Sequence, residues 1–251
     1  MDYQDQVRQL AARMRPDSRI TVLTGAGVSA ASGVPTFRGS GGLWRNFPAH
    51  QLATPEAFRS DPKLVWEWYN WRREVVAQCL PNAAHEAIAA WSRRYPDFAL
   101  VTQNVDGLHE RTGVEGVIRF HGSLWEVFCR DRCEKSPPRW RDDRVPLPEI
   151  PPPCPYCGGL IRPGVTWFGE IIDPEVYARS MAATRCDFFF SVGTSALVYP
   201  AAGLTYEAKR NGAFTVEVNP EVTPASDLVD LSLQGPAEEL MRQLESALHD
   251  K

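Results

Sequence analysis

A glycine-rich turn that directly follows a buried strand is the feature that most restricts how this chain can fold. The apolar run 20–24 leads straight into Gly25-Ala26-Gly27-Val28-Ser29-Ala30, which matches the G-x-G-x-x-G/A pattern. Glycines at these positions let the backbone approach a pyrophosphate at the start of a helix. A tight strand-to-helix turn without a ligand is the alternative. The pattern predicts the first unit of a dinucleotide-binding α/β fold.

Short apolar runs and amphipathic segments alternate along much of the remaining chain. Strands are predicted at 98–102, 117–120, 188–192, 214–218 and 228–231, and helices at 2–14, 62–80, 82–94, 200–211 and from Pro236 onward. This alternation predicts a Rossmann-like, doubly wound parallel sheet with helices on both faces. We assign this dinucleotide-binding domain to residues 1–38, 81–121 and 167–251. Two insertions are expected to form a smaller lobe, with a helical module over 39–80 and a zinc-binding module over 122–166.

One element of an ordinary dinucleotide site is missing. An acidic residue about 20 residues after the glycine turn normally holds a ribose. In this chain a loop, Val34 to Gly39, occupies that region instead. The chain is therefore not expected to be an ordinary hydride-transfer dehydrogenase.

Two cysteine pairs have the spacing of metal ligands. Cys129-x3-Cys133 and Cys154-x2-Cys157 are separated by twenty residues, in a stretch dense in proline. Four thiolates suit a closed tetrahedral zinc site, which would be structural because no position is left for water. Four unrelated cysteines are the alternative, and the other two, Cys79 and Cys186, are expected to be inert core thiols.

Polar residues follow two of the predicted strands. Gln103-Asn104-Val105-Asp106 comes after the strand 98–102, and His121 comes between the strand 117–120 and Gly122. Parallel strands present their ligands at the carboxyl ends. An imidazole at such a place suits a general base, because its pKa lies near neutrality. An Asx turn and a buried structural histidine are the alternatives. His50, His85, His109 and His249 are expected to be structural or solvated.

The predicted helix 62–80 carries Tyr69 and Arg72, which are three residues apart and so share a face. A phenol hydroxyl and a guanidinium together form a good receptor for a carboxylate. The alternative is a helix that packs its tryptophans on the core and leaves Arg72 in solvent.

Composition removes several functional classes. The net charge of −4 gives no reason to expect nucleic-acid binding. No apolar run approaches the ~18 residues of a membrane span, and the acidic start is no signal peptide. We expect a cytoplasmic protein that does not bind membranes, with a monomer as the simplest state.

Several of these stretches resemble the sirtuin family of NAD-dependent protein lysine deacylases. They are GAGVSAASGVPTFRG (25–39), TQNVDGLHERTG (102–113), FHG (120–122), the cysteine pairs, RPGVTWFGE (162–170), VGTSALVYPAA (192–202) and VEVNP (216–220). Ala53, Tyr69 and Arg72 resemble the class III branch, which prefers succinyl and malonyl groups. The chain departs from the family pattern at Thr166, where the family has Val or Ile, and in the three-residue spacing of the first cysteine pair.

The resemblance implies a role for each matching residue. His121 would be the general base, assisted by Asn104 and Asp106. NAD would be bound by Gly25, Ala26, Gly27, Ser29, Phe37, Arg38, Trp44, Gln103, Asn104, Val105 and Asp106, with its adenosine half against Gly193, Thr194, Ser195, Asn219 and Ala237. The acyl-lysine would be bound by Val165, Trp167, Phe168 and Gly169, with Ala53, Tyr69 and Arg72 at the acyl end. The zinc would be bound by Cys129, Cys133, Cys154 and Cys157.

The activity implied is removal of acetyl groups, and of succinyl or malonyl groups, from lysines of proteins or peptides. NAD would be consumed, and nicotinamide and O-acyl-ADP-ribose would be released. Two alternatives stay open, an NAD-dependent protein ADP-ribosyltransferase and a non-catalytic module that binds NAD or ADP-ribose. A zinc-ribbon interaction protein would leave the α/β body unexplained.

Overall fold

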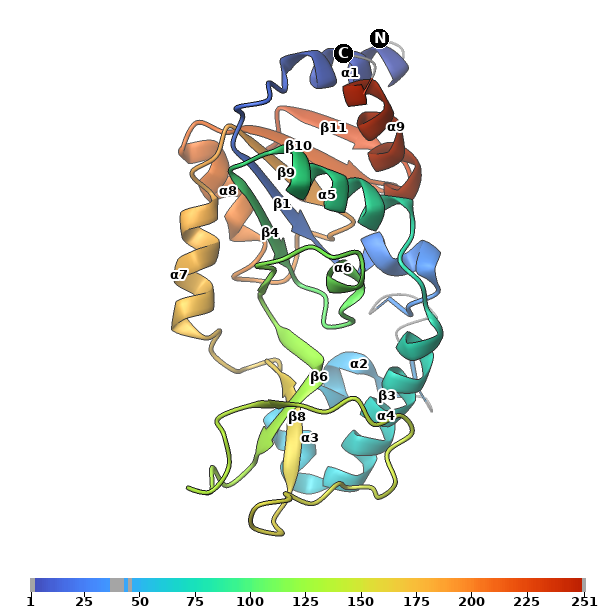
Figure 1. The fold of residues 1–251 in the computed structure, drawn as a ribbon, viewed down its shortest axis with the longest axis vertical. Coiled ribbons are helices and arrows are strands. Elements are labelled where there is room, and N and C mark those ends of the chain that lie inside the picture. The colour runs from blue at the N-terminus through green and yellow to red at the C-terminus, as the bar shows by residue number, and fades with distance from the viewer. Residues whose placement is uncertain (1–2, 37–42, 45–46, 250–251) are drawn as a thin grey trace.

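A six-stranded parallel sheet forms the centre of a large lobe (Figure 1). The computed structural model describes residues 3–36, 43–44 and 47–249. The strand order is β11-β10-β9-β1-β4-β5. The strands are β1 (Ile20–Thr24), β4 (Phe98–Thr102), β5 (Ile118–Arg119), β9 (Phe188–Val192), β10 (Phe214–Asn219) and β11 (Leu231–Gln234). Every pairing in this sheet is parallel, which confirms the predicted Rossmann-like sheet.

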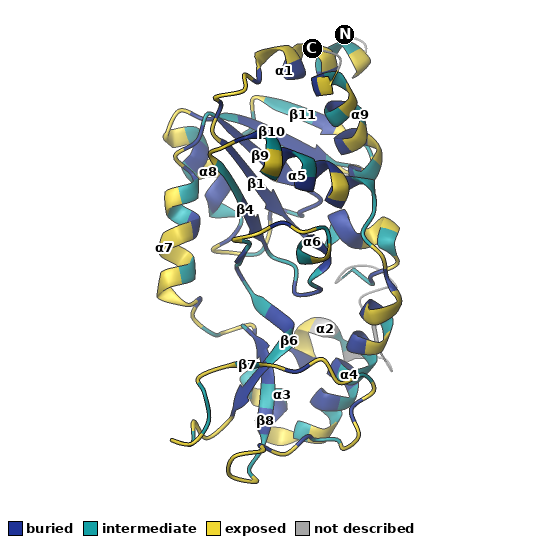
Figure 2. Ribbon diagram, in the orientation of Figure 1, coloured by how far each residue is buried: buried dark blue, intermediate teal, exposed yellow. Residues whose placement is uncertain are grey.

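Helices cover both faces of the sheet. One face packs against α1 (Tyr3–Arg13), α5 (Ala83–Arg94) and α9 (Ala237–His249). The other packs against α7 (Pro174–Ala183) and α8 (Gly203–Arg210). Because successive side chains of a strand point to opposite faces, Val22 and Leu23 of β1 enter different clusters. Figure 2 shows the resulting layering, with buried strands between helices whose outer faces are exposed.

The helix start at Asn82 is tied to the glycine turn. The Asn82 side chain accepts from the Ala84 N–H and its own N–H donates to His85 Nδ1, which forms a capping box. Its Nδ2 also donates to the Val28 carbonyl and to Ser32 Oγ, both at 2.9 Å. Val28 and Ser32 belong to a 3₁₀ helix, η1 (Ala26–Ser32), that follows β1. The cap therefore fixes α5 against the turn.

The smaller lobe combines an antiparallel sheet with a group of helices (Figure 1). The sheet has the order β7-β6-β8, from β6 (Gly122–Cys129), β7 (Trp140–Arg141) and β8 (Ile161–Val165). The helices are α2 (Ala49–Leu52), α3 (Pro55–Ser60) and α4 (Pro62–Gln78), preceded by the short strands β2 (Leu43–Trp44) and β3 (Phe47–Pro48). Helices and sheet share one core, in which Trp66 Nε1 donates to the Ile161 carbonyl at 2.9 Å. The residue boundaries that we assigned to the two lobes stay a prediction.

Several elements differ from the predicted ones. Strands β6 and β8 were not expected, because the metal cysteines and prolines hid their alternation. Helix α7 was missed because its residues are mostly exposed and its apolar periodicity is weak. The final strand, predicted at 228–231, is β11 and begins at Leu231, because the chain from Ala225 to Leu228 makes a turn. In the described part of the chain, no helix has the length and apolarity that a membrane crossing requires.

Candidate active site

The glycine turn lies directly against the segment that follows β9. The Gly27 N–H donates to the Gly193 carbonyl at 2.8 Å. A Cβ atom at Gly25 or Gly27 would lie 2.8 Å from the backbone of residues 194 and 193, respectively. Gly193 has φ +60°, and a Cβ there would lie 2.4 Å from Val28 N. Only glycine permits this contact, which brings two predicted NAD-binding segments together at the carboxyl edge of the sheet.

Thr194 joins residues from three loops of this edge. Gln103 Nε2 donates to Thr194 Oγ1 at 2.9 Å, and Asn219 Nδ2 donates to the Thr194 carbonyl at 2.7 Å. The loops after β4 and β9 and the last residue of β10 therefore meet at Thr194. Residues that the sequence predicted to lie close together do so, although they are up to 116 positions apart, from Gln103 to Asn219.

Ser29 is the centre of a buried polar cluster. Its hydroxyl donates to Asp106 Oδ2 at 2.9 Å and accepts from Asn104 Nδ2 at 3.1 Å. His85 Nε2 lies 3.3 Å from the same hydroxyl. Because His85 Nδ1 accepts from the Asn82 N–H, Nε2 carries the proton and donates to Ser29. His85 thus belongs to the site, and our expectation of a merely structural or solvated side chain was incomplete.

Burial sets the charges in this cluster. Desolvation, together with a smaller effect of the neighbouring His109, lowers the pKa of His85 to about 3. Desolvation also raises the pKa of Asp106, against the hydrogen bonds from the Leu108 N–H and Ser29, which lower it. The imidazole of His85 is therefore neutral near pH 7 and acts as a donor that orients Ser29.

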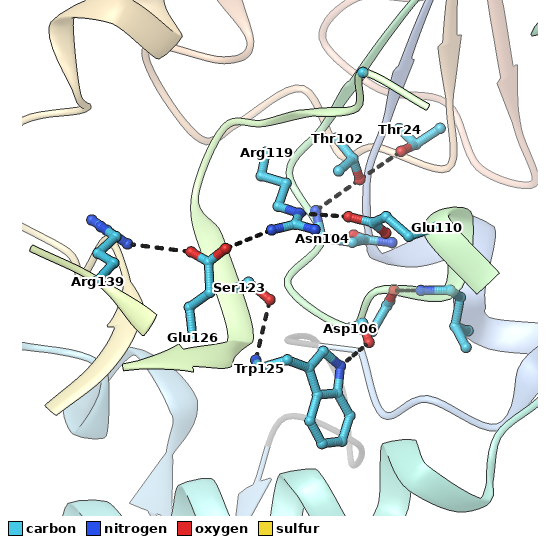
Figure 3. A network of polar contacts seen from close by, with 12 residues as sticks. Thr24, Thr102, Asn104, Asp106, Glu110, Arg119, Ser123, Trp125, Glu126 and Arg139 are labelled. Atoms are coloured by element: carbon cyan, nitrogen blue, oxygen red, sulfur yellow. Dashed lines mark hydrogen bonds and ion pairs between the residues drawn. The ribbon is translucent and has the colours of Figure 1, made fainter. Parts of the chain in front are cut away.

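A second series of buried hydrogen bonds runs from His109 through two threonine hydroxyls to the backbone N–H of Asn104. His109 Nε2 lies 3.0 Å from Thr24 Oγ1, which donates to Thr102 Oγ1 at 2.8 Å. Thr102 Oγ1 also accepts from the Asn104 N–H at 3.1 Å, as Figure 3 shows for Thr24, Thr102 and Asn104. Desolvation lowers the pKa of His109 to about 4, so this histidine is neutral too. Its sequence neighbours gave no sign of this contact, because Thr24 lies 85 positions away.

His121 lies at the junction of the two lobes, between β5 and β6. Its Nδ1 is 3.1 Å from the Gln103 carbonyl, which can only accept, so Nδ1 carries the proton and Nε2 keeps its lone pair. Desolvation lowers the pKa of His121, and the bond to Gln103 raises it in part. Next to it, Gly122 has φ +79° and a Cβ there would clash with the Gly164 carbonyl at 2.1 Å. The neutral ring is therefore held in the tautomer that a general base needs.

Tyr69 and Arg72 are both buried on one face of α4. Trp167 Nε1 donates to Tyr69 Oη at 2.8 Å. Arg72 is only 6% exposed, so the alternative that leaves it in solvent is wrong. Burial raises the pKa of Tyr69 to about 12 and lowers that of Arg72, whose guanidinium lies over the Trp68 ring at 5.4 Å. A buried cation beside a neutral phenol fits a carboxylate ligand.

The segment after β8 completes the region near α4. The Phe168 N–H donates to the Ala53 carbonyl at 3.0 Å, and the Thr166 N–H donates to the His121 carbonyl at 2.9 Å. The guanidinium of Arg162 stacks on the Trp167 ring, 3.6 Å from the ring centroid. The predicted acyl-lysine residues 165–169 thus connect His121 to the helical module.

The four cysteines of the small lobe form one compact group. Their Sγ atoms all lie within 4.8 Å of one another. The contacts Cys129–Cys157 and Cys133–Cys154 measure 3.8 and 4.0 Å. A tetrahedral zinc with Zn–S bonds of about 2.3 Å places its sulfurs about 3.8 Å apart. The group therefore fits a zinc ion, whereas the buried Cys79 and Cys186 lie elsewhere.

A few predicted residues are only partly placed. Phe37 and Arg38 lie outside the described residues, and for Trp44 only the backbone, in β2, is described. Ser195 follows Thr194 and is half-buried, whereas Ala237 begins α9 and is buried in the large-lobe core. Val105 is buried between its two polar neighbours.

The chain is similar in sequence to NAD-dependent protein deacylases of other organisms. A model described as the Sir2 family matches residues 25–200. The NAD-dependent protein deacylase of Aquifex aeolicus (strain VF5) is 47% identical over 233 residues, which cover 92% of this chain and 96% of that protein.

Solved structures are similar over both lobes. A Sir2 homologue in complex with 2′-O-acetyl ADP ribose has a TM-score of 0.88 and 42% identity, covering 100% of this chain and 97% of that one. A complex of Sir2, p53 peptide and NAD⁺ has a TM-score of 0.81 and 28% identity, covering 100% of both chains. The likeness includes every segment that contributes to the site described above.

Proposed function

The chain belongs to the Sir2 family, and we propose that the junction of its two lobes is the site of NAD-dependent protein lysine deacylation. The activity itself follows from the family: the chain is an NAD-dependent protein deacylase that acts on acylated peptides. NAD is its co-substrate, and zinc has a structural role in the four-cysteine group. The roles of individual residues are our proposal.

NAD would supply a glycosidic carbon to which the acyl oxygen bonds as nicotinamide leaves. One water would be consumed as the acyl carbon is released from the lysine nitrogen, so the products would be free lysine, nicotinamide and O-acyl-ADP-ribose. The chain's residues bind and orient the two partners. Asn104 and Asp106, fixed through Ser29, hold the nicotinamide and its ribose. Gly25, Gly27, Gly193 and Thr194 hold the phosphates and the adenosine half. Positioning of this kind can supply much of the rate enhancement.

His121 is the general base of this proposal. The Gln103 carbonyl fixes its tautomer, and burial keeps Nε2 free of a proton near pH 7. Nε2 accepts a proton from a ribose hydroxyl, which makes that oxygen nucleophilic toward the acyl carbon. The observation that carries the proposal is this neutral imidazole, which follows β5 beside the end of β4, where Gln103 and Asn104 lie.

The acyl end of the site selects for a negative charge. Arg72 is buried and positively charged, and Tyr69 lies three residues away on the same helix face. A carboxylate of a succinyl or malonyl group would form a charge-assisted contact with Arg72 and a hydrogen bond with the Tyr69 hydroxyl, and an acetyl group can form neither of these carboxylate contacts. We therefore propose acidic acyl groups as preferred substrates and acetyl groups as weaker ones.

One assay tests the proposal. The purified chain is incubated with NAD and matched acetyl-, malonyl- and succinyl-lysine peptides, and nicotinamide release and peptide mass are followed. Deacylation with one nicotinamide per acyl group removed is the expected result, and His121→Ala is the control. Transfer of ADP-ribose onto protein without any acyl-lysine would instead support a transferase.

The remaining partner assignments are also proposals. The net charge of the chain, −4, argues against nucleic acid as a partner. Six cysteines, four of which suit a zinc site, fit the reducing cytoplasm. We further propose that it acts as a monomer and does not bind membranes.

A further inference from the structure

Trp125, on β6 of the small lobe, contacts the loop that carries Asn104 and Asp106. Its indole Nε1 donates to the Asp106 carbonyl at 2.6 Å, as Figure 3 shows. The neighbouring Leu124 N–H donates to the Val105 carbonyl at 2.9 Å. Two donors from one strand thus bind two successive carbonyls of the loop, whereas Ser29 binds the side chains of Asn104 and Asp106. Different residues therefore fix the polar side chains of this loop and its backbone carbonyls.

The loop residue after Asp106 is shaped to the tryptophan ring. Gly107 has φ +81°, and a Cβ there would lie 3.1 Å from Cδ1 and Nε1 of Trp125. The positive φ turns the chain so that the Asp106 carbonyl faces the indole N–H, and the Leu108 N–H reaches Asp106 Oδ1 at 2.9 Å. Any shift of the ring would therefore move the backbone beside Asp106.

The far side of Trp125 is less constrained. Trp125 is only half-buried, and with Gly107, Glu110 and Arg119 it lines a cavity of about 460 Å³ that lies outside the predicted NAD and acyl-lysine residues. Packing on that side is incomplete, so the hydrogen bond to Asp106 contributes strongly to the orientation of the ring. Its own backbone N–H is fixed to Ser123 Oγ at 3.1 Å.

Strand β6 is in turn held by helix α4. Arg73 is fully buried, and its Nε donates to the Leu124 carbonyl at 2.9 Å. Its guanidinium lies between the rings of Trp66 and Trp125, at 5.6 and 5.9 Å from their centroids. Arg73 is adjacent in sequence to Arg72 of the acyl end. Contacts therefore run continuously from the acyl-binding helix, through Leu124 and Trp125, to the loop with Asp106.

From these contacts we propose that Trp125 is a positioning residue: by binding the Asp106 carbonyl, it holds the nicotinamide side of the site in its working geometry. The proposal rests on the proposed function of Asn104 and Asp106. It assigns to the small lobe, beyond acyl binding, a part in the NAD-dependent step. Because Trp125 touches the loop rather than the acyl group, its effect should be the same for every acyl peptide.

Trp125→Phe tests this directly, because it keeps an aromatic ring and removes only the indole donor. We expect the inhibition constant for nicotinamide to rise about two- to tenfold, as the loss of one hydrogen bond predicts. The KM for peptide should stay unchanged, and kcat should fall by one common factor for acetyl and succinyl peptides. A smaller folded fraction would alter neither constant. Trp140→Phe is the matched control, because its ring packs on Tyr156 instead.

A second variant and a second measurement separate this proposal from the proposed function. Gly107→Ala should place a Cβ against Cδ1 and Nε1 of the ring, the edge that donates to Asp106, and shift nicotinamide inhibition in the same direction. Amide hydrogen exchange at Asn104 and Leu108 should be about two- to tenfold faster in Trp125→Phe. If the wild-type protein released no nicotinamide, the proposed function would fail, while faster exchange would still support positioning. Unchanged exchange, or an unchanged nicotinamide constant, would overturn it.

Discussion

Replacing Arg72 by methionine separates recognition of the acyl charge from the chemistry. Methionine keeps an unbranched apolar chain of similar reach and removes the guanidinium. Because Arg72 is 6% exposed, the charge acts where solvent screens it little. A hydrogen bond to a charged group contributes about 1.5–3 kcal/mol. At 1.4 kcal/mol per factor of ten, that corresponds to roughly a 10- to 150-fold loss of kcat/KM on a succinyl peptide.

The acetyl peptide supplies the internal comparison. It carries no carboxylate, so Arg72→Met should change its kcat/KM by less than about threefold, through packing alone. Arg72→Lys should give an intermediate loss on the succinyl peptide, because an ammonium keeps the charge without the bidentate fork.

The assay measures kcat/KM for both peptides at saturating NAD. Arg59→Met is the matched control, because Arg59 on α3 pairs with Glu56 in solvent and its side chain is 72% exposed. Equal losses on the acetyl and succinyl peptides would refute the reasoning, and so would a wild-type enzyme with no preference between them.

Three further predictions concern the base, the metal and the buried histidines. His121→Ala should lower kcat by about 10²- to 10⁴-fold while calorimetry shows an unchanged NAD affinity, and near-normal turnover would exclude the assigned role. In wild type, activity should fall on acidification only below pH ~6.5, since the pKa of His121 is lowered. Cys133→Ser, or chelation of zinc, should lower the melting temperature and the zinc content together; a stable, zinc-free protein would contradict a structural metal. The pKa values of His85 and His109 lie at about 3 and about 4 in the folded protein, against about 6.5 when unfolded, so the unfolded chain binds more protons between these limits. Stability should therefore be complete above pH ~6.5 and decline as the pH falls toward 4 and then 3, which urea titrations at stepped pH would reveal; a flat profile there would contradict the burial of these rings.

Sequence patterns predicted those features of the molecule that depend on residues close together in the chain. The strand and glycine turn at 20–30 are visible in sequence because a Cβ is excluded by backbone contact, which leaves glycine as the only solution. The cysteine spacing predicted a four-cysteine metal site, because metal ligands need short loops, and the four sulfurs lie within 4.8 Å of one another. The cap at Asn82 and the proline at the start of α4 likewise act within one helical turn.

Residues whose partners lie far along the chain could not be found in this way. His85 occurs within an ordinary helical segment, and its partner Ser29 lies 56 positions away. Trp125 binds the backbone carbonyl of Asp106, and because every residue has such a carbonyl, the side chain at position 106 gives no sign of this contact. Thr24 and Thr102 meet only because β1 and β4 pair in register. Such contacts depend on strand order and register, which follow from the packing of the whole domain.

In the small lobe, the helices and the antiparallel sheet next to the four cysteines share one hydrophobic core, and a hydrogen bond joins Trp66 of α4 to Ile161 of β8. A structural change in the sheet should therefore also change the packing of the helices. Oxidation of the four thiols would loosen the sheet that packs against α4, which carries Tyr69 and Arg72, so we expect the proposed acyl selectivity to depend on an intact cysteine group.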